Sequence, residues 1–123
     1  MKKLVILLIS LQTLFGYNSE VELFNKLFTI LFQKKEIKIY TKKYTFLTPQ
    51  LKIVSSCKLA DLTLGELNCS KPKFLLDYYN FKNDKNAIGA FYWRKGRPQL
   101  RLRKKELEKY KLFISKNFED YLE

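Results

Sequence analysis

The sequence contains no histidine and only four glycines in 123 residues. Without histidine, the chain lacks the commonest general base and cannot form a Ser–His or Cys–His catalytic pair. The glycines stand far apart, so they cannot form a glycine-rich phosphate-binding loop. Asp61, Asp77 and Asp84 could supply an acid and a base, but nothing in their spacing brings two of them together. We therefore expect a protein that is not an enzyme and that uses no cofactor.

Cysteine is equally scarce, since Cys57 and Cys69 are the only two. Their spacing excludes a Cys-x-x-Cys redox motif. A metal site would need two further soft ligands, which argues against metal binding in a chain without histidine. In an exported protein, an even number of cysteines favours a disulfide, and closing a loop of about 13 residues stabilises a fold by about 3 kcal/mol. The alternative is that the two thiols are free or linked to a partner. A redox switch would alternate between the disulfide and the free thiols.

The apolar run at the N-terminus is shorter than the ~20 residues that a membrane-spanning helix needs. Two lysines precede this run, which covers residues 4–15, and small residues follow it. This order is typical of a secretory signal peptide. We expect the signal peptide to cover residues 1–19, with cleavage near 16–19, and the remaining residues 20–123 to form a single domain in the periplasm or outside the cell. A retained membrane anchor is the alternative.

The formal net charge is +12. A basic excess of this size attracts nucleic acid, anionic lipid or the acidic face of a protein. Most of the basic residues are lysines that are scattered through every segment, and a bias in composition would produce the same pattern.

The first element after the signal is predicted to be a helix. Ser19 and Glu22 have the spacing of a capping box, with Ser19 as the N-cap. Apolar residues then repeat at helical spacing until the helix ends near 33–35; the main ones are Leu23, Phe24, Leu27, Phe28 and Leu31. We expect this stripe to pack on a sheet. A helix that faces a partner or a membrane is the alternative.

The rest of the chain predicts strands followed by helices. The expected strands cover 36–41, 51–55, 60–64 and 73–78, with the fourth strand beside the third and the cysteines near one end of the sheet. A polar segment over 80–85 leads to a β-hairpin, and two helices follow over 104–110 and after Ser115. This pattern indicates a single small α/β or α+β domain with a mixed sheet, one N-terminal helix and C-terminal helices.

The hairpin is the most distinctive part of the sequence. Its first arm, 87–93, is apolar on both faces, whereas in the second arm Leu100 and Leu102 alternate with polar residues. Gly96 suits a turn with positive φ, and Pro98 suits the start of an edge strand. Arginine and aromatic side chains are typical of sites that bind phosphates, carboxylates or single-stranded nucleic acid. The candidate binding residues are Tyr92, Trp93, Arg94, Lys95, Arg97, Arg101 and Arg103. The alternative is a solvated edge strand whose charges prevent aggregation.

The order of these elements resembles the YfiR-like family of small periplasmic proteins. The matching segments are Cys57, Ile88-Gly89-Ala90, Lys95-Gly96-Arg97, Leu100-Arg101-Leu102 and Leu112-Phe113-Ile114-Ser115. The resemblance implies a compact α/β domain and a periplasmic regulator that binds a membrane-bound partner which synthesises cyclic-di-GMP. It also implies that cysteine pairing contributes to stability or to a redox response.

Two functions follow from these observations. The first is a non-catalytic periplasmic binding or regulatory protein that contacts the periplasmic part of a membrane protein. The second is a secreted basic protein that binds a polyanion, such as nucleic acid, anionic lipid or an acidic glycan.

Overall fold

The computed structural model describes residues 17–123 of the chain. Residues 1–16 of the predicted signal peptide lie outside this described part, and its last three residues begin helix α2 (Tyr17–Phe32). The predicted N-cap is therefore wrong, because Ser19 lies inside the helix and not before it. A capping box is only a local signal, and a helix extends past it when the preceding residues also keep helical hydrogen bonds.

The apolar stripe of α2 packs on the sheet, as predicted. Its phenylalanines are fully buried, and the ring of Phe74 lies 5.9 Å from that of Phe24 and 5.2 Å from that of Phe28. The stripe is therefore not available to a partner or a membrane. The helix ends at Phe32, and the next residue, Gln33, has a φ of 51°, the left-handed conformation that commonly follows a helix.

Six strands form one mixed sheet, which confirms the predicted α/β domain. The strands lie in the order β2-β1-β3-β4-β5-β6, and every neighbouring pair is parallel except β5 and β6. The strands are β1 (Ile37–Thr41), β2 (Leu51–Val54), β3 (Leu62–Leu64), β4 (Lys73–Leu75), β5 (Gly89–Arg94) and β6 (Arg97–Leu102). The fourth strand lies beside the third, as expected, and β6 is an edge strand.

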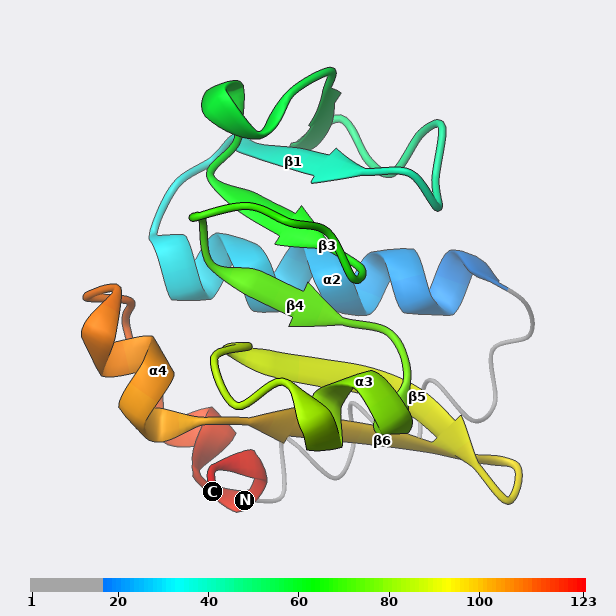
Figure 1. Ribbon diagram of the computed structural model, residues 1–123, viewed down its shortest axis with the longest axis vertical. Coiled ribbons are helices and arrows are strands. Elements are labelled where there is room, and N and C mark those ends of the chain that lie inside the picture. The colour runs from blue at the N-terminus through cyan, green and yellow to red at the C-terminus, as the bar shows by residue number, and fades with distance from the viewer. Residues whose placement is uncertain (1–16) are drawn as a thin grey trace.

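A short helix replaces the end of the predicted fourth strand. The strand stops at Leu75 because Asp77 caps helix α3 (Tyr78–Asn83), its carboxylate accepting the Asn80 backbone N–H at 3.0 Å. The segment predicted as a polar turn is therefore largely helical. Phe81 of α3 is buried against the face of the sheet opposite to α2. Figure 1 shows α2 behind the sheet and α3 in front, so both faces are covered near β5.

The chain ends in helix α4 (Lys104–Lys109) and a 3₁₀ helix, η2 (Lys116–Tyr121), and not in two α-helices. The predicted cap at Ser115 is confirmed, since its hydroxyl accepts the Asn117 backbone N–H at 3.2 Å. The last residue then joins the edge of the sheet, where the Glu123 N–H donates to the carbonyl of Leu102 at 2.8 Å. The C-terminus thus covers the end of β6.

Cys57 and Cys69 form a disulfide, as predicted, with their Cα atoms 6.0 Å apart. Cys57 begins a short 3₁₀ helix, η1 (Cys57–Leu59), and Cys69 lies in the connection between β3 and β4. Figure 1 shows η1 beside the start of β1, so the disulfide fastens the loops at this end of the sheet.

Candidate functional site

The predicted hairpin is confirmed, and its turn is only two residues long. Lys95 and Gly96 both have positive φ, at 53° and 77°, and Arg94 pairs directly with Arg97. Two consecutive positive φ angles define a type I′ turn, whose twist matches the flanking strands and whose second position favours glycine. Arg94, Arg97 and Pro98 therefore belong to the strands, and the strand register sets the face on which each side chain lies.

The first strand of the hairpin divides the candidate residues between two faces. Trp93 points to the α2 face, where its indole N–H donates to Oε1 of Glu20 at 2.8 Å and 45% of its surface is exposed. The hydroxyl of Tyr44 donates to the other oxygen of the same carboxylate at 3.1 Å. Burial and the Glu20 carboxylate raise the pKa of Tyr44, so this phenol stays protonated. Trp93 is thus held by α2, on the face opposite to Arg94.

Arg94 points to the α3 face, and the arginines of β6 point the same way. Arg97 lies directly opposite Arg94, and Arg101 lies opposite Ala90, which is buried on the α3 face. Opposite residues of an antiparallel pair share a face. The guanidinium of Arg94 lies 5.2 Å above the ring of Tyr78, the first residue of α3, which is 43% exposed. We call Tyr78, Arg94, Arg97 and Arg101 the arginine face.

Every arginine of the chain lies at this hairpin. The four arginines are Arg94, Arg97, Arg101 and Arg103, and all other basic residues are lysines. A bias in composition toward lysine explains the scattered lysines, but it does not explain why arginine occurs only here. The concentration of arginine is visible in the sequence and separates this face from the general basic character of the chain.

Two of the candidate residues have structural roles. Tyr92 is buried, with its ring 5.5 Å from that of Tyr78. Arg103 donates hydrogen bonds to the carbonyl oxygens of Phe81, Asp84 and Ala87, and its guanidinium lies 3.9 Å above the Phe81 ring. These contacts of Arg103 therefore hold α3 and the following loop against the sheet. Tyr78 takes the place of Tyr92 as the accessible ring, and the sequence reasoning missed it because it assigned Tyr78 to a strand.

The positive charge of the arginine face is only partly neutralised. Within residues 17–123, no carboxylate lies within ion-pairing distance of Arg94, Lys95 or Arg97. Arg101 has one acidic neighbour, because its Nη1 lies 3.6 Å from a carboxylate oxygen of Glu123, and both side chains are about half exposed. An exposed pair of this kind is worth little. The guanidinium groups are therefore available to an external anion.

Comparison of the chain with protein-family models, curated proteins and solved structures gave no match. The resemblance to the YfiR-like family stays a prediction. In the part of the chain that the structure describes, no helix is both long and apolar enough to cross a membrane. The same residues contain no group of three or more histidine, cysteine or acidic side chains placed to hold a metal ion.

Proposed function

We propose that this protein is a non-catalytic binding protein whose arginine face contacts an acidic surface of a partner protein. The observation that carries the proposal is the gathering of three of the chain's four arginines, together with Tyr78, on one face of an edge hairpin. Arginine and tyrosine are enriched at the centres of protein interfaces, whereas lysine is depleted there. A guanidinium also binds a carboxylate through two parallel hydrogen bonds, which gives direction as well as charge.

The contacts of the fold explain Arg94, which lies over the Tyr78 ring, but not the placement of Arg97 opposite it. Like charges directly opposite each other in an antiparallel pair destabilise the sheet. The two residues flank a turn that already has favourable glycine chemistry, and a solvated edge needs only scattered charge. A partner that neutralises both guanidinium groups would relieve this repulsion.

We further propose that the partner is the periplasmic part of a membrane protein. The disulfide between Cys57 and Cys69 supports an oxidising compartment, because such bonds persist outside the cytosol. The N-terminal pattern of lysines followed by an apolar run supports export.

Polyanion binding is the second candidate, and a specific observation favours it. Tyr78 and its neighbour Tyr79 are both exposed, at 43% and 72%, beside the arginines. Exposed rings next to guanidinium groups suit single-stranded nucleic acid, whose bases stack on aromatic side chains. Affinity for a polyanion falls steeply as salt increases, because each neutralised phosphate releases counterions.

Charge reversal at the arginine face tests the proposal. The tagged protein captures its partner from a membrane extract, and we expect the double variant Arg97→Glu with Arg101→Glu to lose this partner. The matched control is Lys35→Glu with Lys58→Glu, which changes the net charge equally at exposed sites just before β1 and in η1, away from the β5–β6 edge of the sheet. Loss of capture in both variants would indicate a general charge effect. Unchanged capture by the arginine variant would show that the arginine face is not the binding site.

A further inference from the structure

The connections of the central strands leave a crevice in the sheet. β1 and β3 are parallel neighbours whose ends are paired at Thr41 and Leu64. From these ends the chain leaves in opposite directions along the sheet, from β1 to β2 and from β3 to β4. In open α/β sheets, ligands bind at the carboxyl ends of the strands where the connections diverge in this way. This crevice lies outside the arginine face.

A hollow of about 320 Å³ occupies this crevice. Its lining comes from the carboxyl ends of β1, β3 and β4 and the residues that follow them, and it includes Lys42, Lys43, Leu64, Glu66, Leu67, Leu76 and Asp77. The volume is at the lower end of the roughly 300–1,000 Å³ typical of small-molecule sites.

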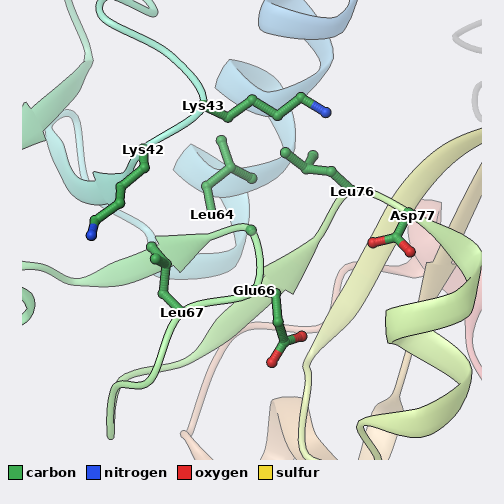
Figure 2. A pocket seen from close by; sticks show the side chains of 8 residues that line it. Lys42, Lys43, Leu64, Glu66, Leu67, Leu76 and Asp77 are labelled. Atoms are coloured by element: carbon green, nitrogen blue, oxygen red, sulfur yellow. The ribbon is translucent and has the colours of Figure 1, made fainter.

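The centre of the hollow is apolar and its ends are cationic. Leu64 is fully buried, and Leu67 and Leu76 are half-buried. Figure 2 shows Leu64 between two lysine side chains that extend away from each other, Lys42 on the side of Leu67 and Lys43 above Leu76. A ligand that covers the leucines therefore lies between two lysine side chains.

The two carboxylates of the rim already have partners. Glu66 pairs at 3.2 Å with Lys73, which also pairs with Asp84 at 2.7 Å. Asp77 accepts hydrogen bonds from the backbone N–H and the side-chain amide of Asn80 at 3.0 and 2.8 Å. Among the described residues, neither Lys42 nor Lys43 has a carboxylate within ion-pairing distance. Both lysine side chains are therefore available to an anion that enters the hollow.

The walls of the hollow are held in place before any ligand binds. Leu67 is two residues from Cys69, whose disulfide with Cys57 ties this loop to η1. On the other wall, the backbone N–H of Lys43 donates to the hydroxyl of the buried Thr41 at 3.2 Å. A preformed site avoids the cost of ordering loops on binding.

We propose that this hollow binds a small organic acid, with its apolar or aromatic body on Leu67 and Leu76 and its anionic group at Lys43 or Lys42. The anionic group is a carboxylate or a phosphate monoester, because either can form an ion pair with a lysine ammonium group that lies next to leucine side chains.

Ligand-dependent stabilisation of the full chain tests this proposal, since a ligand that binds only the folded state raises the unfolding temperature. The probes are phenylacetate, phenyl phosphate, the neutral phenylacetamide and inorganic phosphate. We expect saturable stabilisation by phenylacetate or phenyl phosphate, and the more effective of the two identifies the anionic group. Phenylacetamide and inorganic phosphate should stabilise the protein much less. Phenylacetamide lacks the negative charge, and inorganic phosphate lacks the apolar body.

Variants locate the bound probe. Lys42→Gln with Lys43→Gln should weaken binding by about tenfold, and the control Lys35→Gln with Lys58→Gln should leave binding unchanged. Arg97→Glu with Arg101→Glu should also bind the probe normally, so a failure of the arginine face is distinguished from a failure here. The proposal is overturned if neither acid stabilises the protein saturably, if the neutral probe or inorganic phosphate is as effective, or if the lysine variant binds as tightly as its control.

Discussion

Replacement of Arg97 by glutamate should stabilise the fold while it weakens binding. Arg97 lies directly opposite Arg94 beside the turn, and no carboxylate of the described residues is within ion-pairing distance of either side chain. Like charges in such a pair destabilise and opposite charges stabilise by about 0.2–1 kcal/mol each. Arg97→Glu removes the first effect and adds the second, so we expect a gain of about 1 kcal/mol. For a domain of this size, that gain raises the unfolding temperature by about 4 °C.

Urea unfolding of three proteins measures this effect: the wild type, Arg97→Glu and the neutral variant Arg97→Gln. The neutral variant should gain about half as much, because it removes repulsion without adding attraction. The differences should shrink in high salt, since exposed charges are screened. If Arg97→Glu is less stable than Arg97→Gln at low salt, Arg94 and Arg97 do not repel each other and the argument for a functional origin of the pair fails. A more stable variant that binds its partner less well would show that Arg97 serves binding and not folding.

Three further predictions concern the rest of the fold. Replacing Cys57 and Cys69 by alanine together should lower the free energy of unfolding by about 3 kcal/mol, the chain-entropy value for a loop of this length, as measured by urea unfolding against the wild type. Gly89→Ala should cost about 1–3 kcal/mol, because a Cβ atom there would lie 2.5 Å from a β6 carbonyl oxygen, and a stability equal to the wild type would contradict this close approach. Partial burial alone would raise the pKa of Asp84, but the ammonium of Lys73, 2.7 Å away, outweighs it and lowers the pKa. The Asp84 carboxylate therefore stabilises the fold above its unfolded pKa of about 4, and this contribution is lost as the pH falls through the lowered folded value. Unfolding as a function of pH should accordingly show a shallower acid decline in Asp84→Asn than in the wild type.

The sequence predicted the elements whose signals are local. The alternation of Leu100 and Leu102, with Gly96 before them, is enough to predict a hairpin, and the stripe of α2 predicts its buried face. Helix α3 was missed because the apolar run from Phe74 to Leu76 favours a strand. The Asp77 carboxylate can accept the Asn80 N–H only after the backbone has left the strand conformation. The C-terminal 3₁₀ helix depends on the docking of the last residues against β6, which no local pattern contains.

The candidate site could be predicted only in part. The hairpin register alone places Arg94, Arg97 and Arg101 on one face. The position of Trp93 depends on Glu20, which is 73 residues away in the chain, and the accessibility of Tyr78 depends on how α3 packs. The crevice at the carboxyl ends of β1 and β3 depends on strand order, because β2 pairs outside β1 before the chain crosses back to β3. No local pattern in the sequence indicates that order.

The most direct test of the arginine face as a protein-binding site is the salt dependence of what the tagged protein captures from a membrane extract. Capture is carried out at low and at high salt, and the retained material is identified for the wild type and for the variant Arg97→Glu with Arg101→Glu. The account predicts one membrane protein that is retained at both salt concentrations and is lost from the variant. Nucleic acid or anionic lipid that is washed away at high salt would contradict the account and favour a polyanion-binding protein.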